Sequence, residues 1–246
     1  MKKYIYILTL IILGSCNFIN PFYDEGDTIE TVIELDDFTM IEIHNIFNIE
    51  IVEDAESYII YTGGETIFDE MSYSSLSGIL RLDHRYMNWT KNFEIPGLEI
   101  HMPLLESINL YSSGKIKGLN QLSGDKLMVS VHEESDTYEI DLNINYKELR
   151  FHSKGSVGGT FAIEGKCATS TYTLNGSTNI QASDLISKEV NVAHNSLGNA
   201  HVYAEDKLNI TFFKSGDLYY KGNPSEIEVK YVQINNQDAS GKVIKE

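Results

Sequence analysis

Disulfide bonds cannot hold this protein together, because its 246 residues include only 2 cysteines, Cys16 and Cys167. Cys16 falls in an N-terminal processing segment described below, which leaves Cys167 without an intramolecular partner. We therefore expect Cys167 to be a buried, small apolar residue, with a reactive thiol as the alternative. The chain is long enough to bury a sizeable hydrophobic core without cross-links.

Positive charge is also scarce: 19 Lys and Arg residues face 36 Asp and Glu residues, and the formal net charge is −17 at pH 7. Such a chain has no electrostatic footprint for nucleic acid, and anionic membrane surfaces repel its body. Catalytic signatures are missing too, since there is no Gly-x-Ser-x-Gly, no His-Glu-x-x-His and no phosphate-binding loop. No face of the repeats described below gathers Asp with Lys or Arg. We predict no catalysis, no metal and no cofactor.

A long apolar run occurs only near the N-terminus, at residues 4–13, directly after Lys2 and Lys3. The run is too short to span a membrane as a helix, and its layout is that of a secretory signal. It ends in Leu-Gly-Ser-Cys, which resembles a bacterial lipobox whose cysteine becomes lipidated. We predict a signal peptide over residues 1–15, a lipid anchor on Cys16 and a flexible tether over residues 16–27. Cleavage without lipidation is the alternative.

Helical periodicity is absent as well, and a period of two replaces it from residue 28 onward. Ile41, Ile43, Phe47, Ile49 and Ile51 alternate with polar residues, as half-buried strands require. This pattern predicts an all-β fold. We expect residues 28–105 to form a mostly antiparallel β-sheet.

The clearest positive feature is a repeat of 20 or 21 residues between residues 110 and 220. One strand and one tight turn per unit is the signature of a β-solenoid, which we expect over residues 106–246 in about six or seven rungs. Residues 28–246 would then form one continuous domain. A polar run from residue 235 to the C-terminus would act as a cap. The turns are marked by Gly114, Ser135, Gly155, Gly176, Ser196 and Gly216. Four positions before each turn, a predicted inner column contains Leu110, Val131, Phe151, Tyr172, Val192 and Phe212.

Two histidines, His132 and His152, occupy the same position of the repeat and should stack on neighbouring rungs. Stacked imidazoles beside the acidic residues 133–136 could hold a divalent metal, but zinc and calcium sites need more ligands or a different spacing. We expect a polar outer ladder and a solvated corner instead. Glu134 and Lys154 should form a cross-rung ion pair.

The chain contains a single tryptophan, Trp89, which lies beside Arg85 and Tyr86. Exposed aromatic residues next to hydrogen-bonding groups often grip sugars or protein partners. These three residues are the candidate binding surface. The alternative is a strand connection in which Trp89 fills one end of the core.

Three passages together resemble the auto-transporter adhesin head GIN domain family of Bacteroidetes-type lipoproteins. They are the alternating strands of residues 38–51, the strand–Pro–strand passage of residues 99–108 with its Ser-Gly turn at residues 113–116, and residues 215–224. The last passage contains Ser-Gly-Asp, two tyrosines, Gly and Pro. The resemblance implies a right-handed parallel β-helix at the cell envelope and, from the family name, adhesion.

These observations together predict a non-catalytic, lipid-anchored outer-membrane protein. Its solenoid would act as an adhesin-like or scaffold module that presents a binding surface to a glycan, a host-matrix protein or an envelope protein. One alternative is an envelope-stress or sensory lipoprotein that binds another envelope protein. A carbohydrate-active β-helix enzyme is the second. Both the periplasmic and the cell-surface face remain open for its body.

Overall fold

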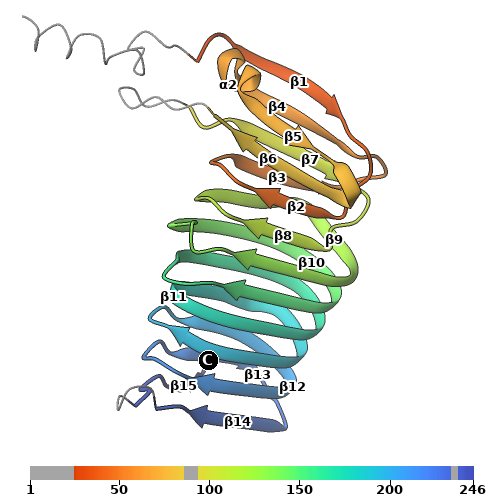
Figure 1. Cartoon of the computed structure of the whole chain (residues 1–246). Helices are drawn as coiled ribbons and strands as arrows, with labels where there is room; N and C mark the ends of the chain where they lie inside the picture. Colours follow the sequence, from red (N-terminus) through yellow and green to blue (C-terminus); the bar gives the residue numbers. More distant parts are fainter. Residues whose placement is uncertain (1–24, 86–93, 234–237) are drawn as a thin grey trace, which may run out of the picture.

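The computed structural model of the protein describes residues 25–85, 94–233 and 238–246. The strands stack into an elongated all-β body with a β-solenoid of about six turns, which confirms the predicted fold class. Strands β1 (Thr28–Glu34) and β4 (Tyr58–Gly64) lie at one end of the stack, and β14 (Glu226–Tyr231) lies at the other (Figure 1).

The N-terminal region is a mixed sheet rather than a mostly antiparallel one. The pairs β1–β4, β4–β7 and β5–β6 are antiparallel, whereas β2 runs parallel to β6 and β8, and β3 runs parallel to β7 and β9. Alternation in the sequence identifies the buried face of a strand but not its direction, which explains the difference. The remaining strands here are β2 (Met40–Ile43), β3 (Asn48–Glu53), β5 (Met71–Ser74), β6 (Ile79–His84), β7 (Gly97–Met102) and β8 (Ser107–Leu110).

In residues 25–85, 94–233 and 238–246, helical structure is limited to α2 (Glu65–Asp69) and a 3₁₀ turn at Leu76–Gly78. No helix in the part of the chain that the structure describes is long and apolar enough to cross a membrane. Ile67 on α2 is fully buried, so this short helix packs onto the N-terminal end of the stack.

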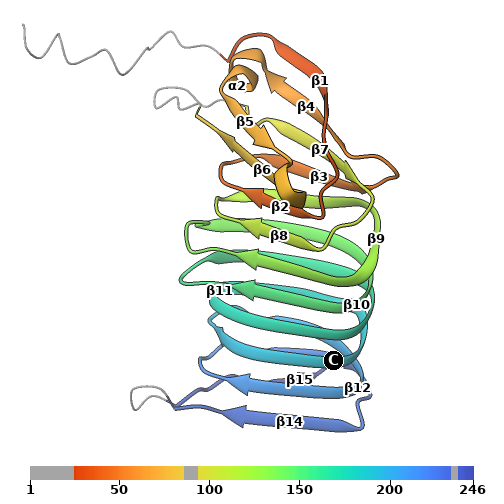
Figure 2. The ribbon, with the colours of Figure 1, turned by 45° about the vertical axis from the view of Figure 1, so that its right-hand side comes forward.

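The solenoid is built from long strands that bend around its corners and pair in parallel, as Figure 2 shows. The first half of β9 pairs with β3, and its last residues pair with β8, so a single strand contributes to two walls. The solenoid strands are β9 (Gly114–Val131), β10 (Thr137–Ser153), β11 (Gly158–Ser196), β12 (Ala200–Phe212), β13 (Leu218–Gly222), β14 and β15 (Val243–Lys245). The C-terminal run, predicted to be a cap, therefore contributes the additional strand β15, which pairs with β13.

All six residues of the predicted inner column are buried, but they form two neighbouring columns rather than one. Phe151 pairs with Val129 and with Tyr172, whereas Val131 pairs with Ser153. The register has therefore slipped by two residues relative to the repeat. A slip of two keeps each side chain on the same face of its strand, so burial survives the error.

Glycine is required where a turn comes against the rung before it. Gly176 has φ +65°, and a Cβ at this position would lie 2.1 Å from the carbonyl oxygen of Val157. Gly155, another predicted turn residue, has φ +68°. An L-residue pays for positive φ, and at Gly176 it would also collide with backbone that cannot move aside.

One polar ring is enclosed in the core near the C-terminal end. His194 is fully buried, pairs with Phe212 in the ladder, and neither of its ring nitrogens has a hydrogen-bond partner. Burial lowers the pKa of His194 from 6.5 to about 4, although the nearby backbone of Asp217 opposes the change. The folded protein therefore holds this imidazole in its neutral form at neutral pH.

We expect Gly176→Ala to destabilise the protein more than Gly78→Ala does. Both glycines have positive φ, but a Cβ at Gly78 would have nothing within 4 Å. The substitution at Gly78 should cost about 1–2 kcal/mol for its φ alone. That at Gly176 should cost a further 1–3 kcal/mol or so because of the collision. Chemical denaturation of the two variants measures the difference, and equal losses would contradict the close stacking of rungs.

The free energy of unfolding should fall as the pH drops from about 6.5 toward about 4, because His194 binds a proton in the unfolded chain but stays neutral in the folded one. This single group accounts for roughly 3 kcal/mol of stability above pH 6.5 that is progressively lost on acidification. In His194→Leu the pH dependence in this window should be weaker by about that amount. Unfolding experiments on the parent and on this variant from pH 4 to 7 measure the difference, and identical pH dependences would contradict the role of His194.

Candidate functional site

The candidate site is a groove along one long wall of the stack. This wall follows the strand order β1-β4-β7-β3-β9-β10-β11-β12-β13-β15. Three hollows of about 720, 360 and 470 Å³ open on it. The largest shares Lys115 with one neighbour and shares Asp141, Ala162 and Gln181 with the other. The hollows are therefore adjoining parts of one surface, which we name the wall groove.

Strand alternation places polar groups in the wall groove. Ile116 and Ile140 point into the core and are buried, so their neighbours Lys115 and Glu139 point outward. The same alternation sets Gln181 on the surface beside buried residues. Each polar lining residue is thus positioned by an apolar neighbour that cannot leave the core.

Charges of both signs alternate across the strands of the wall groove. The register sets Glu50 opposite Lys117 and Lys117 opposite Asp141. The Lys115 ammonium lies 2.8 Å from the Glu139 carboxylate, and both side chains are well exposed. Exposed pairs of this kind contribute about 0–1 kcal/mol, so they are free to exchange partners with a ligand at small cost.

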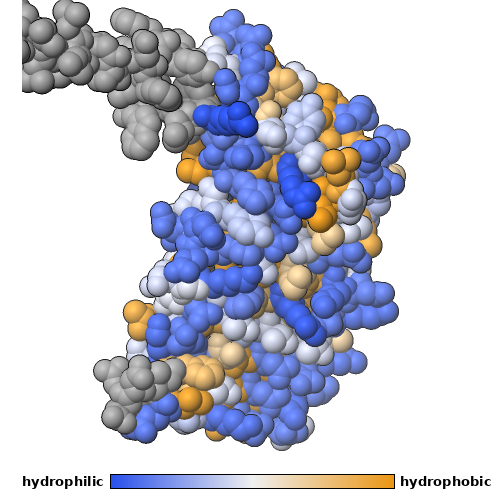
Figure 3. Space-filling view, in the orientation of Figure 1, coloured by the Kyte–Doolittle hydropathy of each residue, from blue (hydrophilic) through white to orange (hydrophobic). Residues whose placement is uncertain are grey.

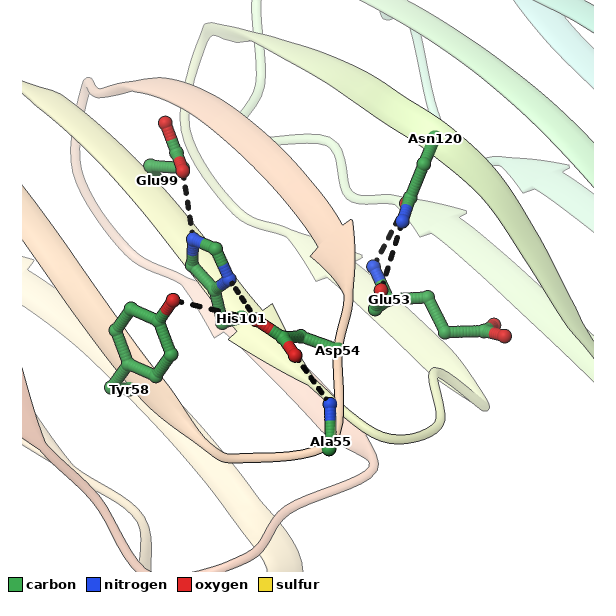
Figure 4. A network of polar contacts seen from close by, with 7 residues as sticks. All are labelled: Glu53, Asp54, Ala55, Tyr58, Glu99, His101 and Asn120. Atoms are coloured by element: carbon green, nitrogen blue, oxygen red, sulfur yellow. Dashed lines mark hydrogen bonds and ion pairs between the residues drawn. The ribbon is translucent and has the colours of Figure 1, made fainter.

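A second polar cluster borders the wall groove around His101, as Figure 4 shows. His101 Nδ1 lies 2.9 Å from Asp54 and Nε2 lies 2.7 Å from Glu99, while the ring stacks on Tyr58 at 4.0 Å between centroids. The Ala55 amide also donates to Asp54 at 2.6 Å. The hydrogen bond from the Ala55 amide, together with His101, lowers the pKa of the Asp54 carboxyl below 3.8.

The His101 cluster is suited to holding strands together rather than to chemistry. Both of its ring nitrogens already face carboxylates, which leaves neither available as a base or as a metal ligand. Next to it, Glu53 and Asn120 exchange two hydrogen bonds of 2.8 and 2.9 Å, which tie the end of β3 to the corner of β9 (Figure 4). The sequence contains no spacing signal for the Asp54–His101 and Glu53–Asn120 contacts, since these partners lie 47 and 67 residues apart.

The sequence-predicted binding cluster is described only in part. Tyr86 and Trp89 lie outside the residues that the structure describes, as does Cys16 with the leader, so their roles stay predictions. Arg85 is exposed, its backbone amide donates to Glu70, and it lines none of the three hollows. Cys167 is buried, as expected, and burial raises the pKa of its thiol to about 11.

His132 and His152, which the repeat predicts to stack on neighbouring rungs, do not lie opposite each other. The register sets His152 opposite Ser130, two residues away from the expected partner, and brings His132 beside Lys154. The Lys154 ammonium lies 3.2 Å from His132 Nε2, where a metal ion would be repelled, and burial lowers the pKa of His132. Lys154 thus faces His132 and not Glu134 as predicted.

His132 belongs instead to an outer ring stack in which Tyr111 lies between two histidines, with its centroid 3.9 Å from that of His132 and 4.6 Å from that of His44. Residues 133, 134 and 136 are exposed, as expected of a solvated corner. In the described ranges, no group of three or more His, Cys, Asp or Glu residues is arranged to hold a metal ion.

The visible face of the molecule is mostly hydrophilic, with apolar side chains scattered over it (Figure 3). A surface of this kind can bind through many modest polar contacts along a length of wall. The wall groove sets amide, hydroxyl and charged groups beside apolar side chains such as Ile95 and Ala162, an arrangement that can hold an extended molecule.

Comparisons with known proteins agree with this geometry. The family model described as "putative auto-transporter adhesin, head GIN domain" matches residues 37–224. A putative adhesin from Bacteroides fragilis has a similar structure, with a TM-score of 0.77, 18% identity and coverage of 89% of this chain and 97% of its own. No curated protein matches the chain.

Two further solved structures share the fold. A putative adhesin from Parabacteroides merdae has a TM-score of 0.61 at 17% identity, and the match covers 90% of this chain and 97% of the other. A putative lipid binding protein from Parabacteroides distasonis has a TM-score of 0.61 at 18% identity, with the same coverage of 90% and 97%. At these identities the likeness establishes the fold alone.

Replacing His101 by Phe tests whether its cluster is a clamp. The variant keeps an aromatic ring on Tyr58 but leaves Asp54 and Glu99 without their partner, so the melting temperature should fall by a few degrees. The clamp also depends on an ionised Asp54, so its contribution should vanish as the pH falls through the lowered pKa of that carboxyl. Thermal melts of parent and variant at neutral and acid pH measure both effects. The parent and variant should converge in acid, and a constant difference would contradict the clamp.

Proposed function

The chain belongs to the putative auto-transporter adhesin, head GIN domain family, and from this premise we propose that it is a non-catalytic, adhesin-like protein of the cell envelope. Its wall groove would hold an extended partner by many weak contacts. The observation that carries the proposal is the continuity of the groove: the largest hollow shares Lys115 with one neighbour and shares Asp141, Ala162 and Gln181 with the other.

The chemistry of the groove favours an uncharged, hydroxyl-rich chain, of which a neutral glycan is the clearest example. Asn48, Thr160 and Gln181 offer amide and hydroxyl groups, while the neighbouring Lys115 donates hydrogen bonds and Glu139 accepts them. A long acidic polymer is disfavoured because the chain carries a net charge of −17.

We also propose that the protein is held at the outer membrane by a lipid on Cys16. The support is the lipobox-like Leu-Gly-Ser-Cys that follows the apolar leader. The described chain begins at the β1 end of the stack, so an anchor there would leave the wall groove clear along the length of the solenoid. A short tether between lipid and fold suits this arrangement.

Ala162→Trp should weaken binding through the groove about tenfold, because a partly exposed Ala162 lies where two of the hollows adjoin and an indole would fill them. The matched control is Thr173→Trp, which places the same ring on an outward position of β11 that lines none of the three hollows. Cells that produce the full chain are tested for retention on immobilised neutral polysaccharides, with acidic polysaccharides and host-matrix proteins for comparison.

We expect retention on a neutral polysaccharide that the Thr173 variant keeps and the Ala162 variant loses by tenfold or so, with unchanged melting temperatures. If cells are retained on a matrix protein alone and the two variants differ in the same way, the groove is still the binding site but its ligand is a protein rather than a glycan. Equal retention of both variants would show that binding takes place elsewhere. The absence of retention for the parent would favour an internal envelope partner instead.

A further inference from the structure

The solenoid ends in an open strand. Among the residues that the structure describes, β14 pairs with β12 on one side and with no strand on the other. All six residues of β14 are exposed. An edge of this kind presents a row of free backbone groups to another chain, and many proteins block such an edge with a proline or a bulge. Residues 226–231 contain no proline, and their pairing with β12 is regular.

The exposed strand continues the inner columns of the solenoid. The register sets Ile227 under Leu208, Val229 under Ile210 and Tyr231 under Phe212. The three upper residues are buried, whereas the three lower ones are 42%, 37% and 55% exposed. The last rung therefore leaves an apolar row uncovered, and the next rung of a stack is what would cover it.

The charges of β14 match those of β14 itself when two copies run antiparallel about Val229. Glu228 of one copy then lies opposite Lys230 of the other, and the reverse contact follows by symmetry. Ile227 lies opposite Tyr231 in the same arrangement, and Val229 lies opposite itself. Within residues 227–231 every cross-strand pair is thus either oppositely charged or apolar, which is the combination that stabilises antiparallel strands, whereas Glu226 lies opposite Val232 at the margin.

The backbone has the parity that this pairing needs. The Val232 amide donates to the Phe212 carbonyl oxygen at 2.9 Å, so it points toward β12. Amides of successive residues point to opposite sides of a strand, which turns those of Tyr231, Val229 and Ile227 toward the open edge. These are the residues that form hydrogen-bonded pairs when the two-fold axis passes through Val229.

The opposite end of the stack lacks this match. On β1, Glu30, Val32 and Glu34 are exposed. An antiparallel pairing of β1 with itself about Val32 would set Glu30 of one copy against Glu34 of the other, and like charges directly opposite are destabilising. The β1 edge, paired in this way, therefore lacks the matching charges of β14.

We propose that β14 pairs antiparallel with β14 of a second copy of this chain, forming a two-fold dimer joined at the C-terminal ends of the two solenoids. The contact is isologous, so it closes at two chains. Because each solenoid extends away from the shared edge, the two N-terminal ends lie at opposite ends of the dimer. The wall groove takes no part in the contact, since none of its three hollows is lined by residues of β14.

A charge exchange within β14 tests the proposal. Glu228→Lys sets lysine against lysine at two symmetric contacts, and Lys230→Glu sets glutamate against glutamate. Each should weaken the dimer by about tenfold or more, and the double variant Glu228→Lys/Lys230→Glu should restore it to within about threefold of the parent. Both residues are exposed, so all four proteins should melt alike. Sedimentation of the full chain in a mild detergent, over a range of concentrations, measures the dissociation constants.

A second variant tests the position of the two-fold axis. In Val229→Cys the two new thiols should face each other across a hydrogen-bonded pair, at a Cα separation of about 5.5 Å that a disulfide can bridge. Mild oxidation should then give a covalent dimer. Two controls should form no covalent dimer: the Val32→Cys variant on the β1 edge, and the parent chain with its native cysteines.

Three results would overturn the proposal. They are a parent chain that stays monomeric at every concentration, a double variant as weak as the single ones, or a mass that grows beyond two chains. The last result would indicate head-to-tail stacking. Because the β14 variants leave the wall groove intact, a failed dimer and failed glycan binding are separate outcomes.

Discussion

The parallel ladder of backbone hydrogen bonds between successive rungs is the constraint on which the rest of this structure depends. It stacks equivalent residues about 4.8 Å apart, so each inner side chain must fit the ones above and below it. Val129, Phe151 and Tyr172 satisfy this requirement as one continuous column. The same spacing brings the turn at Gly176 so close to the preceding rung that a side chain there has no room. Core and turns therefore follow from a single repeat distance.

This constraint explains which features the sequence predicts and which it does not. The spacing of small residues and the alternation of apolar ones identify the solenoid and the buried face of each strand, because both depend on neighbours along the chain. The register depends on contacts between rungs, which the sequence pattern does not record. A two-residue shift in register, such as the one that sets Val131 opposite Ser153, leaves the same residues buried, so the apolar pattern does not reveal it. The His101 cluster was missed for the same reason: Asp54 and His101 meet only through the pairing of strands.

A core filled by stacked columns leaves few places for function. Polar groups inside it are mostly paired, as when Tyr138 donates to Thr178 at 3.1 Å or Ser135 donates to the Leu110 carbonyl at 2.8 Å. His194 is an exception, and it lies two rungs from the open end. In the part of the chain that the structure describes, the three hollows of the wall groove open on an outer wall. There the ladder itself sets polar side chains in rows, which suits a partner that is long rather than compact.

The two ends of the stack differ because the ladder stops in different ways. At the N-terminal end β1 reverses direction against β4, its outward residues include Glu30 and Glu34, and α2 packs over the end with Ile67 buried. At the C-terminal end the parallel ladder simply runs out at β14, whose apolar row faces solvent. Burying that row requires another strand, and only a sequence that matches its alternating charges can supply one without repulsion. The sequence of β14 meets that condition itself, so the end of the fold also encodes its own partner.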